Sequence, residues 1–272
     1  MIPFTKAHAC GNDFLVVMEE DAQGHDLAEL ARRLCARNTG MGADGVEYFR
    51  WAGLCAGHIT LRNADGSHAE ISGNGTRCVA AWMALKMDAR AGDEMRITTD
   101  AGLRLCRIDA VGRAGVNSID ITAGMGVPQF APQTVTLESG ARIAGTFVSM
   151  GNPHFVIVTD NDYFAVDGCA WQQVGTEICR HPDFSNHTNV AFVRIRSQRE
   201  VEFRIFERGV GPTSSSGTGT SASAVAAIAY HNCVSPVRVV APGGAQTVAW
   251  GGAGTELALT GPAAMIAWGE AW

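Results

Sequence analysis

The sequence predicts an α+β protein made of two similar halves, in each of which a curved, mostly antiparallel sheet wraps around a central helix. Three observations support this prediction. Short sequence patterns occur twice in the same order. Between them lie brief segments in which apolar and polar residues alternate, as is typical of strands. Each half also has one alanine-rich apolar segment that begins with the pattern Ser-Gly-x-Gly-Thr.

The repeat is the strongest of these observations. A glycine followed by Asn12, and another followed by Asn152, each precede an apolar run and then a candidate helix. The Ser-Gly-x-Gly-Thr patterns begin at Ser72 and Ser216, and the spacing from each asparagine to the serine that follows it is nearly the same in both halves. Landmarks in the same order at similar spacing indicate two copies of one unit, which we expect to be related by a pseudo-two-fold axis.

Local patterns predict the elements of each half. The segments that follow the Ser-Gly-x-Gly-Thr patterns contain good helix formers and few charges, so we expect them to be buried central helices. Two further candidate helices are HDLAELARRLCAR, from His25, and FAVDGCAWQQVGTEICRH, from Phe164. The expected strands include AGHITLRNA, EMRITTDAG, NSIDITAG, TNVAFVRI and EVEFRIFE.

The composition excludes several kinds of partner. The 272 residues carry a formal net charge of −6, whereas nucleic-acid binding needs a basic surface. No apolar run reaches the roughly 20 residues of a membrane span, and the first residues lack the apolar segment of a secretory signal. We therefore expect a cytoplasmic protein without a nucleic-acid or membrane partner. The eight cysteines and eight histidines are scattered, so we expect reduced, mostly buried thiols and no bound metal.

The two Ser-Gly-x-Gly-Thr patterns are candidate anion sites. The first N–H groups of a helix lack partners within the helix, and the helix dipole adds partial positive charge there. Glycines allow a ligand such as a carboxylate to approach the backbone closely. Two such helix starts could face each other across an interdomain cleft, with Ser72 and Ser216 on opposite sides of one small molecule. The alternative for each pattern is an ordinary N-capped helix after a tight turn.

Polar residues near these patterns suggest the kind of ligand. Asn63 precedes the first pattern, and Glu207 and Arg208 precede the second. Arg208 could hold a carboxylate through two hydrogen bonds, and Glu207 could accept from an ammonium group. Asn152 and Asn189 lie at expected loop edges, where each alone could serve only in a turn. Together with the helix starts, these residues predict a site for a zwitterion with an additional polar tail.

Eight segments of the chain resemble the diaminopimelate epimerase family, and they extend along nearly its whole length. They are GNDF (11–14), GADG (42–45), NADGS (63–67), GNGTRC (73–78), GNPH (151–154), TNV (188–190), ERGVG (207–211) and GTG (217–219).

The resemblance implies a diaminopimelate epimerase-like fold with two pseudo-symmetric domains, the last residues returning to the first domain. Pro128 and Pro132 suggest the linker between halves, which gives domains of 1–118 with 262–272, and of 119–261. The resemblance also implies a cofactor-independent isomerase that interconverts L,L- and meso-diaminopimelate by inversion at the α-carbon, in lysine biosynthesis. It further suggests a homodimer with a small amino-acid substrate.

The resemblance assigns roles to individual residues. Glu207 would contact the amino group at the reacting end of the substrate. The residues implied for the distal end are Asn12, Asn63, Asn152, Asn189 and Arg208. The residues implied for the reacting carboxylate are Gly73, Asn74, Gly75, Gly217 and Thr218.

The chain departs from the family at the two proton-transfer positions. The family uses two cysteines, one on each face of the α-carbon, whereas this chain has Ser72 and Ser216. In addition, Pro212 stands where glutamate is usual, and His187 where arginine is common. A thiol with a pKa of about 8.5 is readily ionised at a helix N-terminus. A serine hydroxyl is far less acidic and needs a neighbouring base.

Three hypotheses follow from this departure. The chain could be a diaminopimelate epimerase that uses serines, with His154 or His68 as the candidate partners for them. It could be a related isomerase, racemase or dehydratase of the same fold with another substrate. It could also be a non-catalytic protein that binds an amino acid. Cys78, six residues after Ser72, is expected to lie inside the helix and is a poor substitute for a base at the helix start.

Overall fold

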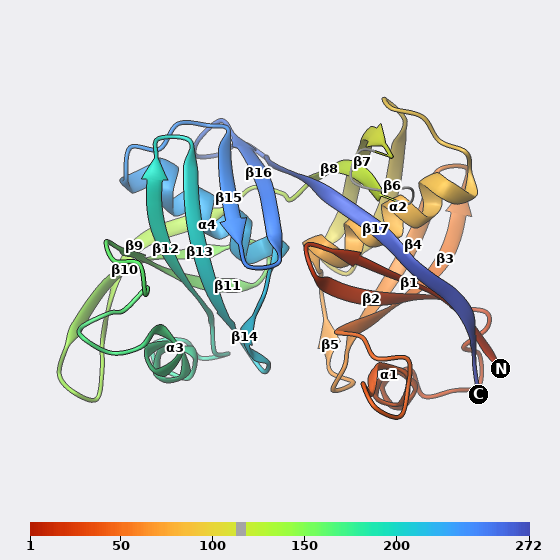
Figure 1. Ribbon diagram of the computed structural model, residues 1–272, viewed down its shortest axis with the longest axis horizontal. Helices are drawn as coiled ribbons and strands as arrows, with labels where there is room; N and C mark the ends of the chain where they lie inside the picture. Colours follow the sequence, from red (N-terminus) through yellow and green to blue (C-terminus); the bar gives the residue numbers. More distant parts are fainter. Residues whose placement is uncertain (113–117) are drawn as a thin grey trace. The chain divides into compact units, whose positions relative to one another are not determined.

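The computed structural model describes residues 1–112 and 118–272, which form two compact units (Figure 1). Unit 1 comprises Met1–Gly124 and Thr260–Trp272, and unit 2 comprises Met125–Leu259. Strand β8 (Ser118–Gly124), which the sequence-based boundary placed in the second half, belongs to unit 1 because it pairs with β7 (Gly102–Val111). Asn117, the first residue of the expected strand NSIDITAG, lies outside the described residues.

The sheet of unit 1 closes on itself. Its strands pair in the order β17–β1–β2–β3–β4–β6–β7–β8, and β8 pairs again with β17. The pairs β2–β3 and β4–β6 are parallel, so the sheet is mixed rather than purely antiparallel. The bounds are β1 Ile2–Ala9, β2 Asn12–Met18, β3 Gly45–Gly53, β4 Ala56–Asn63, β5 His68–Ala69, β6 Glu94–Thr99 and β17 Leu257–Ala271.

Helix α2 (Gly73–Lys86) is the core of unit 1. Its residues from 73 to 84 are all buried, and its apolar side chains form one cluster with residues from the surrounding strands. Small side chains at Ala80, Ala81 and Ala84 allow the sheet to approach the helix on every side. Helix α1 (Leu27–Cys35) packs on the other face of the sheet and begins at Asp26, whose carboxylate accepts from two backbone N–H groups of the first turn.

Unit 2 repeats the element order of unit 1. Its strands pair in the order β9–β10–β11–β12–β13–β15–β16, with β11–β12 and β13–β15 parallel. Helix α4 (Gly217–Tyr230) lies in its core, as α2 does in unit 1. The bounds are β9 Gln129–Thr136, β10 Arg142–Ser149, β11 Pro153–Thr159, β12 Asn189–Ser197, β13 Glu200–Glu207, β14 Gly211–Thr213, β15 Val237–Ala241, β16 Gly244–Trp250 and α3 Trp171–Cys179.

Two local expectations are corrected. The helix expected from Phe164 begins only at Trp171, because Phe164 and Asp167 adopt left-handed backbone angles (φ 57° and 50°) that interrupt a helix. Pro132, expected in the linker, lies within β9, where it pairs with Thr146. β9 pairs with β10 in the described part of the chain, and prolines in sheets are tolerated mainly in edge strands.

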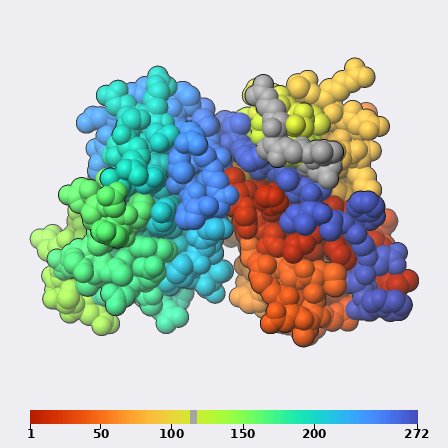
Figure 2. All heavy atoms as spheres, viewed as in Figure 1, coloured from red at the N-terminus to blue at the C-terminus, as the bar shows by residue number. Residues whose placement is uncertain are grey.

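Strand β17 carries the end of the described chain along β1. The register runs from Ile2 opposite Ala271 to His8 opposite Ala264, and the two terminal segments lie side by side on the surface of unit 1 (Figure 2). No helix in the described part of the chain is long and apolar enough to cross a membrane. None of the eight cysteines, all of which lie in the described part of the chain, forms a disulfide; Cys169 is exposed, Cys55 is half-buried and the other six are buried.

Candidate functional site

Both Ser-Gly-x-Gly-Thr patterns start a helix, and in both the serine is the N-cap. Ser72 Oγ accepts a hydrogen bond from the backbone N–H of Gly75 at 3.0 Å, and Ser216 Oγ accepts from Gly219 at 3.3 Å. The hydroxyl group of each serine is therefore held at the positive end of its helix dipole, with its own O–H still available as a donor. Ser72 is half-buried and Ser216 is 5% exposed.

The third helical residue must be glycine in both units because there is no room for a side chain. A Cβ atom at residue 75 would overlap Glu47 Oε1 and would lie 3.2 Å from Cβ of Ser72. A Cβ atom at residue 219 would overlap Cδ1 of Ile205 and would lie 3.1 Å from Cβ of Ser216. The glycines thus let one strand side chain approach each helix start directly beside the capping serine.

In unit 1, a chain of side-chain hydrogen bonds orients two of the expected substrate-binding amides. Arg77 donates to Asn74 Oδ1 at 2.7 Å, and Asn74 Nδ2 donates to Asn12 Oδ1 at 3.0 Å. Asn12 Nδ2 in turn donates to Asp44 Oδ2 at 2.6 Å, and Arg37 holds Asp44 Oδ1 at 2.7 Å. Because each member is fixed by the next, the remaining N–H groups of Asn12 and Asn74 have defined directions.

A neighbouring carboxylate strengthens this network. Asp13 is paired with Lys6 at 3.0 Å and with Arg37 at 3.0 Å. Burial alone would raise the pKa of Asp13, but hydrogen bonds from Arg37 and Lys6 outweigh it and hold the pKa below its ordinary value. Asp13 is therefore charged at neutral pH. It shares Arg37 with Asp44, which links this pair to the oriented amides.

Asn63 takes no part in that network. It lies at the end of β4, where its side chain donates to Ser67 Oγ at 2.9 Å and its backbone N–H donates to the Ser67 carbonyl at 2.9 Å. These bonds close the turn over residues 63–67. The structure thus shows Asn63 in the role of a turn residue.

In unit 2, the expected binding residues form two smaller groups. Asn152 Nδ2 donates to Thr218 Oγ1 at 3.3 Å, which joins the start of β11 to the start of α4. Asn189 Nδ2 donates to the Pro153 carbonyl at 2.9 Å, and its Oδ1 accepts from the backbone N–H of Arg208 at 2.9 Å. The side chain of Asn189 therefore connects the first residue of β11 with the residue that follows β13.

Glu207 and Arg208 lie at the turn between β13 and β14. Glu207 Oε1 accepts from Thr213 Oγ1 at 2.5 Å, and the guanidinium of Arg208 donates to the Asn186 carbonyl at 2.9 Å. Arg208 is exposed, so its other N–H groups face solvent and can reach an anion. Pro212 pairs with Phe206 across this turn.

The two histidines named as partners for the serines are engaged elsewhere. His154 is fully buried, and burial together with the nearby charge of Arg208 lowers its pKa to about 3. It therefore stays neutral, with its Nε2 3.1 Å from Asn152 Oδ1. His68 Nε2 lies 2.7 Å from Asp100 Oδ2 and makes no hydrogen bond with Ser72 among the bonds described. Cys78 lies inside α2, and burial raises the pKa of its thiol, so it remains protonated.

Three buried or partly buried residues of unit 1 were missed as site residues. Asp44 and Arg77 lie within the segments GADG and GNGTRC, so their signal was present in the sequence but was read only as family resemblance. Glu47 is a single carboxylate within the otherwise apolar run GVEYF of β3. A charged residue at a core position of a strand is itself a signal of function.

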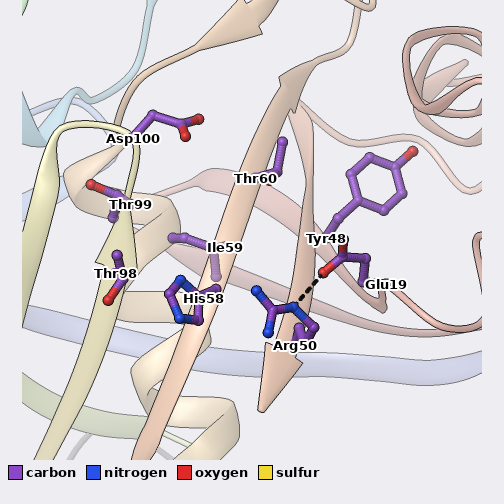
Figure 3. A pocket seen from close by; sticks show the side chains of 9 residues that line it. All are labelled: Glu19, Tyr48, Arg50, His58, Ile59, Thr60, Thr98, Thr99 and Asp100. Carbon is purple, nitrogen blue, oxygen red and sulfur yellow. Dashed lines mark hydrogen bonds and ion pairs between the residues drawn. The ribbon is translucent and has the colours of Figure 1, made fainter. Parts of the chain in front are cut away.

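A separate polar pocket lies on β3, β4 and β6 (Figure 3). The ion pair between Arg50 and Glu19, 3.1 Å apart, forms part of its wall, with His58, Thr98 and Asp100 among the other lining residues. None of the predicted site residues lines it. Among the described residues, no group of His, Cys, Asp or Glu is arranged to hold a metal ion.

Known proteins resemble the chain over its whole length. A sequence profile of the family described as diaminopimelate epimerase matches residues 4–131 and 146–266. The diaminopimelate epimerase of Pseudomonas savastanoi pv. phaseolicola is 32% identical over 284 residues, with 99% of each protein covered. That of Xanthomonas campestris pv. campestris is 34% identical over 284 residues, covering 98% of this chain and 95% of the relative.

A solved structure shares the fold at much lower identity. The probable proline racemase from Agrobacterium radiobacter superposes with a TM-score of 0.74 and 15% identity, covering 100% of this chain and 93% of that one. This match confirms the predicted fold class. Because these relatives are named as epimerases and a racemase, which are isomerases, they also place the chain among isomerases. The chain therefore belongs to the diaminopimelate epimerase family.

Proposed function

We propose that the chain is a cofactor-independent amino-acid epimerase that interconverts L,L- and meso-diaminopimelate by proton transfer at the α-carbon. The observation that carries this proposal is the pair of equivalent helix starts. Each has a serine N-cap, a glycine at the third helical position and an asparagine from a neighbouring strand start close to the first turn. Such a pair suits a substrate whose α-carbon exchanges a proton on either face.

The helix starts supply the electrostatic part of the reaction. Removal of the α-proton leaves an electron pair that spreads onto the substrate carboxylate. Backbone N–H groups at a helix N-terminus and the helix dipole stabilise that developing charge. We propose that residues 73–75 and 217–218 bind this carboxylate. The oriented amide of Asn74, fixed by Arg77, is the best-defined side-chain donor among them.

We propose that the distal end of the substrate is bound by Asn12, Asn63, Asn152, Asn189 and Arg208, and its reacting amino group by Glu207. Support differs between them. Asn12 and Asn189 are held by two hydrogen bonds each, so they are preorganised for binding. The exposed guanidinium of Arg208 suits a carboxylate. From the family alone we also propose a cytoplasmic homodimer, which sedimentation at micromolar concentration would test.

The deciding experiment measures exchange of the α-hydrogen of L,L-diaminopimelate in deuterated buffer, followed by mass and chiral analysis. We expect deuterium incorporation together with meso product from the unaltered chain, and faster turnover from Ser72→Cys combined with Ser216→Cys. Exchange of another amino acid instead would establish a related isomerase. Binding of diaminopimelate without exchange, with turnover only in the double cysteine variant, would establish a non-catalytic binding protein.

A further inference from the structure

Glu47 is the most unusual ionisable group of the molecule. Its side chain is completely buried on β3, and neither carboxyl oxygen has a hydrogen-bond partner among the described residues. A buried carboxyl without a partner costs several kcal/mol, so it is seldom found unless the protein uses it. The two helix starts and the asparagines assigned to substrate binding do not involve Glu47.

The carboxyl group lies beside the start of α2. Oε1 occupies the space that a Cβ atom of residue 75 would fill, and that position lies 3.2 Å from Cβ of Ser72. The strand neighbours of Glu47 are Val16 on β2 and Leu61 on β4, both apolar. On α2, the only ionisable group whose pKa responds to Glu47 is the buried thiol of Cys78. Glu47 forms no ion pair within the described part of the chain, and Ser72 borders the same space beside residue 75.

Unit 2 shows that the fold does not require a carboxyl at this place. The register of β12 with β11 and β13 puts Ala191 at the position that Glu47 occupies in unit 1. There the space beside the helix start is filled by Ile205. An apolar side chain therefore suffices for packing, and Glu47 is present for another reason.

We propose that Glu47 is the proton acceptor for Ser72, so that the two residues together replace an ionised cysteine on one face of the substrate. This inference rests on the proposed proton transfer at the α-carbon. Ser72 makes no hydrogen bond with Glu47 in the described structure, so its hydroxyl must turn toward the ionised carboxylate before the transfer. Ser72 Oγ then takes the α-hydrogen as a proton while its own hydroxyl proton passes to the Glu47 carboxylate. The C–H electron pair stays on the substrate and spreads onto its carboxylate. The reverse transfers return the proton, so no oxidant, reductant or co-reactant is needed.

The charge state of Glu47 fits this role. Burial raises its pKa to about 8, close to the ordinary pKa of a thiol. A carboxylate with that pKa is a far stronger base than an exposed glutamate and still forms at mildly alkaline pH. The positive end of the α2 dipole lies beside it and favours the anion at the moment of transfer. Glu47 acts through Ser72 and is therefore a positioning and proton-accepting residue behind the group that touches substrate.

The first test compares Glu47→Gln with the unaltered chain in α-hydrogen exchange. Gln keeps the size of the side chain but cannot accept a proton. We expect exchange to fall by about 100-fold or more, while the dissociation constant for diaminopimelate changes less than about threefold. In the unaltered chain the exchange rate should rise with pH, with a midpoint near pH 8 and a plateau above it, and in Glu47→Gln this rise should disappear. Exchange within about threefold of the unaltered rate would overturn the proposal.

A cysteine background separates proton acceptance from a structural role. A thiol at a helix N-terminus ionises without help, so Glu47→Gln added to Ser72→Cys should lower exchange by less than about threefold. An equal loss in both backgrounds would mean that Glu47 only maintains the structure, and would overturn the proposal. Glu47→Leu serves as a second variant that removes the buried charge and should give the same pattern.

A further measurement needs no substrate and so separates this inference from the proposed function. Infrared difference spectra, with Glu47→Gln as the reference, follow the carboxylic acid band of Glu47 against pH. We expect a pKa near 8, raised by about 1 in Ser72→Ala because the ionised carboxylate then lacks the hydroxyl that would turn toward it and donate. If the pKa is the same in Ser72→Ala, the coupling is absent and the inference fails, whatever the substrate. If the coupling is present but diaminopimelate is not exchanged, the proposed substrate is wrong and the proton pair stands.

Discussion

The starts of α2 and α4 have the same backbone arrangement but carry different chemistry. Each begins at a serine N-cap and has a glycine at its third position. Two completely buried ionisable groups lie at the start of α2, namely Glu47 from β3 and Arg77 from the helix itself. At the place in α4 that corresponds to Arg77 stands Ser221, whose hydroxyl donates back to the Gly217 carbonyl at 3.0 Å. The same helix start is charged in one unit and neutral in the other.

The difference shows what the shared architecture requires and what it leaves free. A capped helix and a glycine at its third position are needed in both units because the strand packs against the helix there. The group that fills the space beside the glycine differs, since a carboxyl and an isoleucine both fit. Proton-transfer capacity is therefore a property of individual strand residues, and the two faces of a substrate would meet unequal partners.

The largest expected effect is an opposite pH dependence of stability in the two units. Folding raises the pKa of Glu47 from 4.5 to about 8. The stability that this shift contributes is therefore fully present below pH 4.5 and is lost as the pH rises through 8. Folding lowers the pKa of His154 from 6.5 to about 3. The stability that this shift contributes is therefore fully present above pH 6.5 and is lost as the pH falls through 3. Each loss is on the order of 5 kcal/mol when the group has fully changed its charge.

Urea unfolding of Glu47→Gln and His154→Gln, each compared with the unaltered chain from pH 4 to 9, measures these contributions. Relative to the unaltered chain, Glu47→Gln should gain stability as pH rises, and His154→Gln should gain it as pH falls. If the difference in unfolding free energy between each variant and the unaltered chain does not change with pH, the pKa of neither group is shifted by folding.

The next effect concerns the two glycines. Gly75→Ala and Gly219→Ala should each destabilise the protein by about 1–3 kcal/mol, since the added Cβ meets Glu47 in one unit and Ile205 in the other. Each destabilising substitution should be rescued only by a second substitution that removes the atoms its new Cβ overlaps. Glu47→Ala should restore Gly75→Ala, and Ile205→Val, which removes Cδ1, should restore Gly219→Ala. Thermal unfolding of the four single and the matched and crossed double variants checks this, and equal rescue by the wrong partner would contradict the contacts.

A smaller contrast is expected between the two asparagines that follow the repeated glycines. Asn12→Ala removes a 2.6 Å bond to the Asp44 carboxylate and an acceptor for Asn74, and should cost about 2 kcal/mol. Asn152→Ala removes a 3.3 Å bond to Thr218, between neutral groups, and should cost about 1 kcal/mol. Urea midpoints at pH 6 provide the comparison, and a larger loss for Asn152→Ala would reverse the assigned importance of the two networks.

The smallest effect belongs to the helix caps. Ser72→Ala and Ser216→Ala each remove one N-cap hydrogen bond and should cost about 1 kcal/mol. Ser72→Asn and Ser216→Asn keep a capping oxygen and serve as controls that should lose only a few tenths of that value. If Ser72→Ala instead stabilised the protein, the contact between the serine and the nearby buried carboxyl of Glu47 would be unfavourable.

Sequence patterns predicted the parts of this fold that depend on neighbours along the chain. The alternating segments became strands, and the Ser-Gly-x-Gly-Thr patterns became capped, buried helices, because capping and amphipathicity are local. The start of α3 was misplaced because the left-handed conformations at Phe164 and Asp167 are imposed by the turn before the helix. Parallel pairs such as β4–β6 were missed, because a strand's partner depends on the path of the whole chain.

The candidate site was predictable to a similar depth. Asn12, Asn74 and Asn189 could be named from their motifs, and the structure shows what holds each of them. The turn formed by Asn63 and Ser67 is local and was one of the alternatives that the sequence allowed. The engagement of His68 with Asp100 could not be foreseen, since it depends on the distance between separate segments. The position of Glu47 beside the start of α2 could not be predicted, because the sequence does not show which face of β3 packs against that helix.

The path of β17 has a consequence for the order in which the protein is completed during synthesis. The barrel of unit 1 needs residues 260–272 to join β1 and β8, although its other strands lie within residues 1–124. A ribosome therefore releases nearly all of unit 1 and then the whole of unit 2 before the closing strand emerges. During that interval the edges of β1 and β8 are unpaired and open to other chains. Unit 1, most of which is synthesised first, is therefore the last to complete its strand pairing.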